Sequence, residues 1–269
     1  MGIRFWLAML LWLPALVCAG GQTLVFGIYA ADKPTATLKK IRPRLQALER
    51  ALAARGPVAL RVRIAPTYEK GLDDLLQGKV DFARLGPASY LEAKRRDPGI
   101  RILALESHDG RKRFNGVIAV RQDSGIRTVA DLKGRSFAFG NRRSTIGRYL
   151  AQAYLLGHGI RADDLAAYDY LGRHDKVGWA VATGRFDAGA LKEPTFRKLV
   201  QAGAPLQVLA TFPNVTKPWV AASRLDEATF QRLRAAMLAL SPALFLPGDE
   251  TDFDSVRAAI ARSAHFFRD

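Results

Sequence analysis

Short apolar stretches alternate with amphipathic stretches along most of this chain, and this alternation restricts the folds that it can adopt. Residues 23–28 (TLVFGI) form the compact apolar run of a buried strand. Leucine and isoleucine then recur at helical spacing from Leu38 to Leu52, and Pro43 predicts the start of this helix or a kink in it. Similar strand and helix pairs follow along the chain. The pattern predicts an α/β fold with mostly parallel sheets flanked by helices.

Two segments repeat the same local pattern. Residues 78–83 (GKVDFA) and 184–189 (GRFDAG) each follow a helix with a glycine, a basic residue and a strand that begins with an apolar residue and an aspartate. A basic, polar break at residues 107–113 separates the two runs. We therefore expect two similar lobes with a cleft between them, where small ligands often bind. The C-terminal helical stretches, residues 227–240 and 253–263, are expected to pack on the first lobe.

The N-terminus has the features of a segment that directs export. Arg4 precedes a short apolar run over residues 5–17, and small residues follow it. Cleavage after Ala19 would make residues 1–19 a signal peptide, and the alternative is an uncleaved membrane anchor. Cys18 is the one cysteine of the chain, so the composition excludes a disulfide framework and a cysteine-based zinc site.

The formal charge of +16 raises nucleic acid, anionic lipid and a small anion as candidate partners. Export argues against nucleic acid, and the chain has neither zinc-finger spacing nor the interleaved basic and aromatic residues of single-strand binders. The excess lies mainly within residues 20–208, whereas residues 209–269 carry equal numbers of basic and acidic side chains. We expect most of this charge to be solvated surface that steers an anion toward the cleft.

The segment at residues 141–147 (NRRSTIG) is the sharpest candidate site, because it follows a predicted strand and opens a predicted helix. Unpaired N–H groups and the helix dipole favour an anion at such a position. Ser144 and Thr145 add hydroxyl groups, and Arg142 and Arg143 add charge. The alternative is an ordinary helix cap without a ligand.

Two further strand-to-helix turns carry candidate ligands. In the turn at residues 172–175 (GRHD), His174 can donate to an anion, and Asp175 can cap the helix or fix the histidine tautomer. The alternative is a capping Asp175 beside a surface histidine. Tyr68 and Tyr90 lie near two other helix starts, where their hydroxyl groups can bind an oxyanion or their rings can serve only in packing. Ligands gather at this edge of open α/β sheets.

Four stretches of the chain resemble the phosphate-, phosphite- and phosphonate-binding proteins of ABC importers. The most specific is the segment at residues 68–90, which contains GKVDFARLGPASY. The others are residues 144–150 (STIGRYL), 173–175 (RHD) and 181–196 (VATGRFDAGALKEPTF). The similarity runs over about residues 23–210, in order, and the C-terminal sixty residues match only loosely.

This resemblance implies a two-lobed type II periplasmic-binding-protein fold and a periplasmic location. The first lobe would contain residues 20–110 and 212–269, and the second residues 114–208. Hinge crossovers would lie near residues 107–115 and 207–214. The resemblance also implies that hydroxyl groups, a histidine and tyrosines hold the ligand, at positions that correspond here to Ser144, Thr145, His174, Tyr68 and Tyr90.

The chain departs from the family pattern at three places. Ile146 stands where the family often has a third hydroxyl residue, which predicts a more apolar pocket. Arg142 and Arg143 precede the serine, where acidic or small residues are usual. Family members that bind aminoalkyl phosphonates use an acidic residue near Glu193, but Lys192 beside it can exclude an amine. The expected ligand contacts are Tyr68, Tyr90, Arg143, Ser144, Thr145, His174, Asp175 and Glu193.

We therefore expect a monomeric solute-binding protein that captures a small phosphorus oxyanion and delivers it to an ABC permease in the membrane. The alternative is a sensory or partner-binding protein that binds a different small ligand on the same fold. A hydrolase is disfavoured, because Ser144 lacks a G-x-S-x-G elbow and adjacent His174 and Asp175 would project in different directions from a helix start. No cofactor, metal ion, catalytic residue or nucleic-acid partner is expected.

Overall fold

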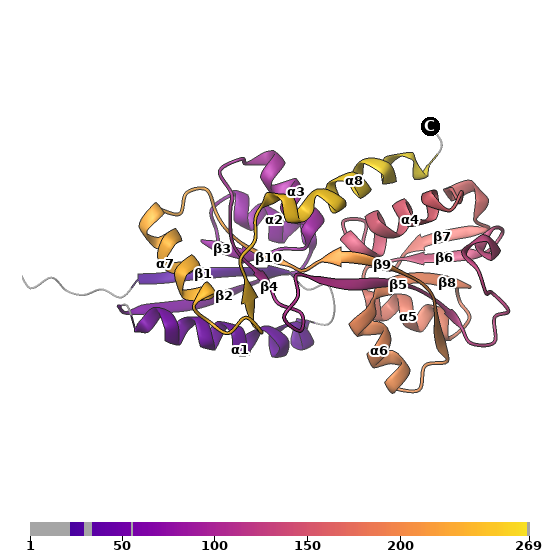
Figure 1. Cartoon of the computed structure of the whole chain (residues 1–269), viewed down its shortest axis with the longest axis horizontal. Helices are drawn as coiled ribbons and strands as arrows, with labels where there is room; N and C mark the ends of the chain where they lie inside the picture. Colours follow the sequence, from indigo (N-terminus) through magenta and orange to yellow (C-terminus); the bar gives the residue numbers. More distant parts are fainter. Residues whose placement is uncertain (1–21, 30–33, 55, 268–269) are drawn as a thin grey trace, which may run out of the picture.

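The computed structural model describes residues 22–29, 34–54 and 56–267, and these form two α/β lobes side by side (Figure 1). The predicted signal peptide, residues 1–19, lies outside the described residues. Within the described part of the chain, no helix is both long enough and apolar enough to cross a membrane. The two-lobed α/β architecture predicted from the sequence is confirmed.

The first lobe is built on a six-stranded sheet with the order β11-β4-β10-β3-β1-β2. Its strands are β1 (Gln22–Tyr29), β2 (Val58–Ala65), β3 (Phe82–Arg84), β4 (Arg101–Glu106), β10 (Pro218–Ala221) and β11 (Phe245–Leu246). Helices cover both faces, because one face packs on α1 and α7 and the other on α2 and α3. These helices are α1 (Pro34–Ala53), α2 (Tyr68–Leu76), α3 (Pro87–Arg96) and α7 (Glu227–Leu238).

The second lobe is built on a five-stranded sheet with the order β7-β6-β8-β5-β9. Its strands are β5 (Arg113–Arg121), β6 (Ser136–Phe139), β7 (Ala167–Tyr170), β8 (Ala188–Lys192) and β9 (Leu206–Val215). One face packs on a π-helical segment and α4, and the other on α5 and α6. These are η2 (Thr145–Leu150), α4 (Ala151–Gly157), α5 (His174–Ala182) and α6 (Glu193–Gln201). Short 3₁₀ turns are η1 (Val129–Leu132), η3 (Ala162–Asp164), η4 (Glu250–Phe253) and η5 (Ala264–Phe266).

Both sheets are mixed, where the sequence predicted mostly parallel sheets. In the first lobe β10 pairs antiparallel with both β3 and β4, and in the second β5 pairs antiparallel with both β8 and β9. The reason is the path of the chain, because β5 enters the second sheet directly from the first lobe and β10 returns directly from the second. Neither strand is preceded by a crossover helix, so each runs against its neighbours.

Two connections join the lobes. Residues 107–112 lead from β4 to β5, and residues 216–217 lead from β9 to β10. The connections are hydrogen-bonded to each other, since the amide of Thr216 donates to the carbonyl of Lys112 over 2.8 Å. In Figure 1, β5 and β9 run side by side away from this junction.

The repeated aspartates have the same structural task in both lobes. Asp81 lies before β3, and its carboxylate accepts a hydrogen bond from the Val25 amide of β1 over 2.7 Å. Asp187 lies before β8, and its carboxylate accepts from the Ser136 amide of β6 over 2.8 Å. Each aspartate thus ties a strand to its neighbour, which explains the echo between residues 78–83 and 184–189.

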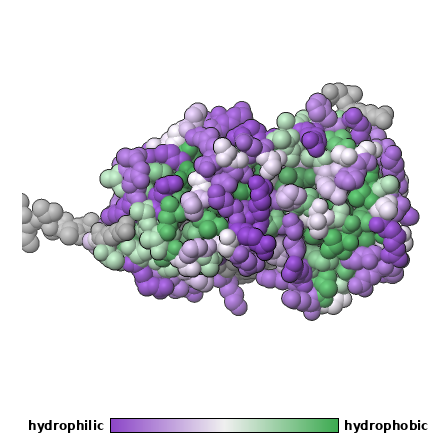
Figure 2. Space-filling model, in the orientation of Figure 1, coloured by the Kyte–Doolittle hydropathy of each residue, from purple (hydrophilic) through white to green (hydrophobic). Residues whose placement is uncertain are grey.

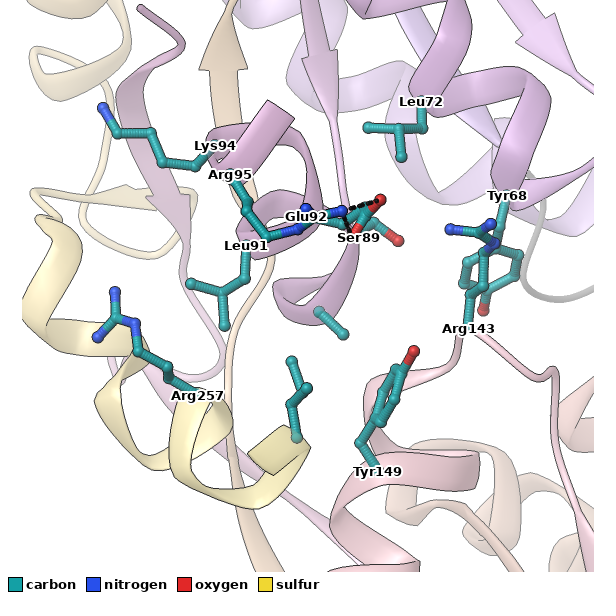
Figure 3. A pocket seen from close by; sticks show the side chains of 12 residues that line it. Tyr68, Leu72, Ser89, Leu91, Glu92, Lys94, Arg95, Arg143, Tyr149 and Arg257 are labelled. Atoms are coloured by element: carbon teal, nitrogen blue, oxygen red, sulfur yellow. Dashed lines mark hydrogen bonds and ion pairs between the residues drawn. The ribbon is translucent and has the colours of Figure 1, made fainter. Parts of the chain in front are cut away.

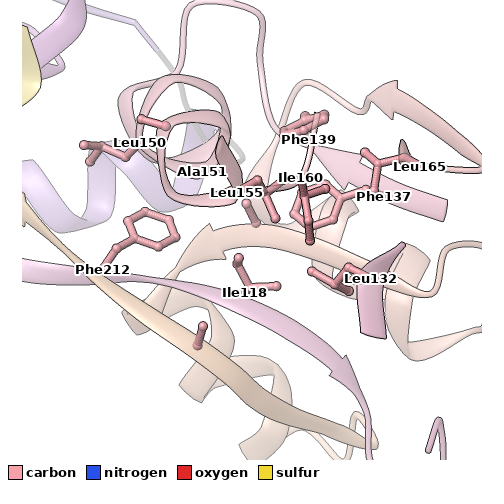
Figure 4. Close-up of a cluster of buried hydrophobic side chains, with 14 of the residues drawn as sticks. Ile118, Leu132, Phe137, Phe139, Leu150, Ala151, Leu155, Ile160, Leu165 and Phe212 are labelled. Atoms are coloured by element: carbon pink, nitrogen blue, oxygen red, sulfur yellow. The ribbon is translucent and has the colours of Figure 1, made fainter. Parts of the chain in front are cut away.

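Each lobe has aromatic side chains at the centre of its core. In the first lobe, Trp219 of β10 stacks on Phe26 of β1, with ring centroids 4.5 Å apart. In the second lobe, Phe137 and Phe139 of β6 pack against Ile118 of β5 and Leu155 of α4 (Figure 4).

The C-terminal helix α8 (Asp254–Ser263) lies across both lobes, where the sequence placed the C-terminal helices on the first. Its Val256 belongs to the first-lobe core, but its Ala259 packs into the core of the second lobe with Phe266 of η5. By contrast, α7 packs on α1 and β4, as expected. Pro43 lies inside α1 and does not start it. The helix begins at Pro34 instead, and proline is well suited to a first helical position.

Candidate anion-binding site

The turn after β3 in the first lobe and the turn after β6 in the second meet at the interface between the lobes. A hydrogen bond and an ion pair cross this interface. The Thr145 hydroxyl of the second lobe accepts a hydrogen bond from the Ala88 amide of the first over 2.9 Å. The Arg143 guanidinium lies 2.8 Å from the Glu69 carboxylate of α2. Figure 2 shows hydrophilic side chains gathered over the middle of the molecule, where the lobes meet.

The N-terminus of α3 presents backbone donors to this interface. The Gly86 amide donates to the Tyr29 hydroxyl oxygen over 2.6 Å, and the Ala88 amide donates to Thr145. Pro87 between them has no amide hydrogen, so it leaves no donor without an acceptor. The Tyr29 hydroxyl in turn donates to the Ser89 hydroxyl over 3.0 Å. The helix start is thus a cluster of donors whose acceptors are hydroxyl oxygens.

The rings of Tyr29 and Tyr68 pack against each other beside this cluster. Their ring centroids lie 4.2 Å apart, and both side chains are buried. Burial raises the pKa of Tyr29, so its hydroxyl keeps its proton at neutral pH and stays a donor. Two glycines allow the Tyr29 ring to fit, because a Cβ atom on Gly71 would lie 2.8 Å from ring atom Cδ1 and one on Gly86 would lie 2.8 Å from the hydroxyl.

The predicted serine–threonine turn opens η2, as a π-helix in place of the α-helix expected there. The Ser144 hydroxyl accepts from the Gly147 amide over 3.0 Å, and the Ser144 carbonyl accepts from the Tyr149 amide over 3.2 Å. π-helical turns are rare and often occur at functional sites. Gly147 is required here, since a Cβ atom on it would lie 2.8 Å from Cα of Gly140.

Ile146 does not face the ligand cleft, which corrects the expectation of a more apolar pocket. Its side chain is buried in the core of the second lobe, where it packs near Phe212 and Gly116. Adjacent side chains of a helical turn point in different directions, so Thr145 reaches the first lobe while Ile146 packs in the core of the second.

His174 is the first residue of α5 and is buried, with 3% of its surface exposed, so it is not the surface histidine of the alternative interpretation. The cap of α5 is Arg173, not Asp175. Asp175 instead makes a two-point ion pair with the Arg173 guanidinium, over 2.9 and 3.1 Å.

The pair of Arg143 and Glu69 is a charged contact between the lobes. Burial raises the pKa of Glu69, but hydrogen bonds from its own amide and the Thr67 hydroxyl, together with the charge of Arg143, outweigh burial and leave the pKa lowered. The carboxylate is therefore ionised at neutral pH. Arg142 lies elsewhere, over the Tyr170 ring at 4.3 Å from its centroid.

Two of the expected ligand contacts, Tyr90 and Glu193, interact with other side chains outside the cluster at the interface. Tyr90 is buried beside Phe253, with ring centroids 4.7 Å apart, and burial raises its pKa to about 12. This placement favours packing as the role of Tyr90. Glu193 is the first residue of α6 and pairs with Arg197 one turn later.

A cavity of about 450 Å³ adjoins the cluster between the lobes. Figure 3 shows Tyr68 and Arg143 on one side of it, Leu91 and Arg257 on the other, and the Tyr149 hydroxyl directed toward Arg143. Its lining residues come from α2, α3, η2, α8 and the turn before η2: Tyr68, Leu72, Ala88, Ser89, Leu91, Glu92, Lys94, Arg95, Arg143, Tyr149, Arg257 and Ile260.

The structure thus brings together Tyr68, Arg143 and Thr145, with Ser144 at the start of the same turn. Sequence reasoning missed Tyr29, Ser89 and the amide of Ala88 as members of this cluster. The signal for Ser89 was available, because residues 86–89 follow a strand and open a helix in the same way as residues 141–145. Among the described residues, no three histidine, cysteine or acidic side chains gather as a metal ion would require.

The chain matches a family model described as the periplasmic phosphonate substrate-binding protein of an ABC transporter, over residues 26–262. A curated relative, a probable phosphite-binding protein of an ABC transporter in Prochlorococcus marinus, is 27% identical over 42% of this chain. A phosphonates-binding periplasmic protein of Escherichia coli is 27% identical over 79% of it. The matches span 40% and 64% of the lengths of these two relatives.

Solved structures share the fold. The methylphosphonate complex of a Prochlorococcus marinus protein superposes with a TM-score of 0.78 at 20% identity, over 91% of this chain and 99% of that one. A binding component of a phosphonate transporter from Pseudomonas aeruginosa has the same TM-score at 18% identity, over 91% and 88% of the two chains. These superpositions establish a common fold.

Proposed function

The chain belongs to the periplasmic substrate-binding proteins of phosphonate ABC transporters, and from this premise we propose that it captures a small phosphorus oxyanion between its lobes and delivers it to an ABC permease. The oxyanion is a phosphonate, phosphite or phosphate. The family consists of binding proteins and not of enzymes. Residues 1–19 are proposed to be the signal peptide that takes the chain to the periplasm, where it acts as a monomer.

One observation carries the proposal: the start of α3 and the start of η2 face each other, and the Ala88 amide meets Thr145 between them. Both are helix N-termini with outward N–H groups, which favour a negative charge. In this proposal an oxyanion replaces hydroxyl oxygens as the acceptor for these amides. Charge-assisted hydrogen bonds of this kind are each worth about 1.5–3 kcal/mol.

The proposed ligand contacts keep the residues named from the sequence except Tyr90, which packs beside Phe253, and add to them. Thr145, Ser144 and Tyr68 would donate hydroxyl hydrogens, and His174 would donate from its buried ring. Arg143 would supply charge. Tyr29 and Ser89 join them from the first lobe. In this proposal Asp175 and Glu193 act through the arginines that they hold.

Binding is proposed to close a hinge between the two lobes. The sequence placed residues 212–215 in the first lobe and a crossover near residues 207–214, but these residues belong to β9 and pair with β5 in the second sheet. The hinge lies at the two hydrogen-bonded connections, residues 107–112 and 216–217. Because a ligand shifts a conformational equilibrium only by its differential affinity for the two states, the oxyanion must contact both lobes in the closed form. The facing helix starts meet this requirement.

Calorimetric titration of the purified protein with methylphosphonate, phosphite and phosphate tests the capture step, with sulfate as the comparison anion. We expect at least one phosphorus oxyanion to bind, to raise the Tm and to lower the radius of gyration in X-ray scattering. No binding of any of them at millimolar concentration would contradict the proposal. Delivery is tested separately, by stimulation of the ATPase of the cognate permease in vesicles, which a purely sensory protein would not produce.

A further inference from the structure

The cavity next to the anion cluster is larger than the smallest proposed ligands require. Its volume of about 450 Å³ lies within the range of roughly 300–1,000 Å³ that is usual for sites of drug-sized molecules. Phosphite and methylphosphonate have only a handful of non-hydrogen atoms, and the donor cluster alone can hold them. The cavity therefore offers room for a part of a ligand that these anions lack.

The cavity is continuous with the cluster through shared residues. Ala88 contributes a donor amide to the cluster, Ser89 contributes a hydroxyl, and both also line the cavity. Tyr68, which packs on Tyr29, lines the cavity as well. A ligand whose oxyanion sits at the start of α3 can thus extend directly into the cavity. Beyond the cluster, the cavity wall contains apolar side chains from three helices, namely Leu72, Leu91 and Ile260.

The charged groups around the cavity have partners within the protein. Each of its four cations lies within ion-pair distance of a carboxylate, and the pairs are Arg143 with Glu69, Arg95 with Glu92, Lys94 with Glu250 and Arg257 with Asp254. A second negative group on the ligand would have to compete with these carboxylates. An amine on the ligand would have to compete with Arg95 for Glu92, the one carboxylate among the lining residues.

On the basis of the proposed function, we propose that the preferred ligand is an organophosphonate with an uncharged apolar substituent of several carbon atoms. Its oxyanion occupies the donor cluster, and its substituent occupies the cavity between α3, η2 and α8. The apolar contacts of Leu72, Leu91 and Ile260 then select for size and hydrophobicity. Because α8 crosses both lobes, the substituent also adds contacts that favour the closed form.

Calorimetry with a series of phosphonates tests this inference directly. The probes are methyl-, propyl-, hexyl- and phenylphosphonate, with 2-aminoethylphosphonate and phosphonoacetate as charged ligands of similar size to the propyl compound. Burial of each methylene should tighten binding roughly fourfold. We expect propylphosphonate to bind about 15-fold more tightly than methylphosphonate, and the two charged ligands to gain nothing over methylphosphonate.

Cavity-filling variants locate the effect. Ile260→Trp fills the cavity from α8, and Leu91→Trp fills it from α3, so that either variant should bring the affinity ratio of hexyl- to methylphosphonate close to one. Ala261→Trp places the same side chain on the exposed neighbouring position of α8 and should keep the ratio of the parent protein.

The outcomes separate this inference from the proposed function. Methylphosphonate that binds at least as tightly as every longer phosphonate overturns the inference and leaves the proposed function in place. A chain-length effect that survives both filling variants also overturns it. Failure of every phosphonate while phosphite or phosphate binds overturns the inference alone. Failure of phosphite and phosphate as well overturns the proposed function and this inference with it.

Discussion

Three consecutive residues at the start of η2 have three different tasks. Ser144 caps the turn, Thr145 reaches the first lobe, and Ile146 packs into the core of the second. The sequence predicted the hydroxyl pair correctly as a helix start, because serine and threonine before an apolar helical run are a clear signal. It could not predict the direction of Ile146, which depends on how the turn packs against the second sheet.

Tyr29 shows why part of the site was not predictable. It is the last residue of a strand that is apolar from Leu24 onward, and nothing in the residues around it marks that strand end as facing the other lobe. Its role follows from contacts with Gly86 and Ser89, which lie about sixty positions later in the chain. Long-range pairs of this kind are set by the assembled fold, which a local pattern does not contain.

Removal of the Thr145 hydroxyl should weaken ligand binding while it keeps the shape of the side chain. We expect Thr145→Val to raise the Kd for methylphosphonate roughly 10- to 100-fold, since the charge-assisted hydrogen bond from the Thr145 hydroxyl to the oxyanion is lost. Calorimetric titration measures the change. Thr211→Val, on an exposed position of β9, is the matched control. An unchanged Kd for Thr145→Val would show that this hydroxyl does not touch the ligand.

A buried ion pair between Arg84 and Glu106 should dominate the acid sensitivity of the first lobe. Burial raises the pKa of Glu106, but the charge and hydrogen bonds of Arg84, helped by Arg44 and Lys217, outweigh it and lower the pKa to about 2. The folded value lies below the ordinary value of 4.5, so the pair stabilises the fold fully above about pH 5. This stabilisation, on the order of 3 kcal/mol, is lost as the pH falls toward 2.

Glu106→Gln tests this pair. It leaves the Arg84 charge buried without its partner, and we expect a loss of about 3–5 kcal/mol in the free energy of unfolding at pH 7. The variant should also lose much of the stability change between pH 5 and pH 2. Urea unfolding followed by circular dichroism measures both effects. Glu227→Gln removes a largely exposed partner of Arg101 and should change stability by less than about 1 kcal/mol. Equal effects of the two variants would contradict the assignment.

The spacing of apolar residues predicted most of the helices and strands that have a recognisable hydrophobic face and a residue that marks where they end. The strand predicted at residues 23–28 is β1, and the helical stretches predicted at residues 227–240 and 253–263 are α7 and α8. Strand β10 was missed, because its four residues are too few to show a period and Pro218 starts it. Its place in the middle of the first sheet follows from the return of the chain out of the second lobe.

The close approach of Gly140 and Gly147 makes the shape of η2 sensitive to a single methyl group. In Gly147→Ala the new Cβ atom would lie 2.8 Å from Cα and 3.0 Å from the amide nitrogen of Gly140, and backbone atoms cannot yield as a flexible side chain can. We expect a lower Tm and weaker methylphosphonate binding. Gly157→Ala at the end of α4 meets nothing within 4 Å and should leave binding unchanged. A fully stable Gly147→Ala protein with unchanged affinity would show that η2 tolerates the shift.

For the whole molecule, the positive charge is a property of both lobes, whereas specific contacts between them are few. The sequence predicted that the excess of basic over acidic residues within residues 20–208 is mostly solvated. Basic side chains such as Arg95, which is 73% exposed, agree with this prediction. Charge of this kind raises the local concentration of an anion but does not select one anion from another. Selection must come from groups that contact the ligand in the closed form.

The ion pair between Arg143 and Glu69 should assist closure only weakly, because both side chains are almost half exposed, at 41% and 48%. Exposed pairs contribute about 0–1 kcal/mol and are screened by salt. We expect Glu69→Gln to weaken methylphosphonate binding by less than about fivefold in 50 mM salt, and by nothing measurable in 500 mM salt. The effect of Thr145→Val should persist at both concentrations, since its hydrogen bond is buried. Calorimetry at the two salt concentrations separates these contributions. If Glu69→Gln cost more than tenfold in high salt, this carboxylate would be part of the ligand site itself, and the lobes would close on a different set of contacts.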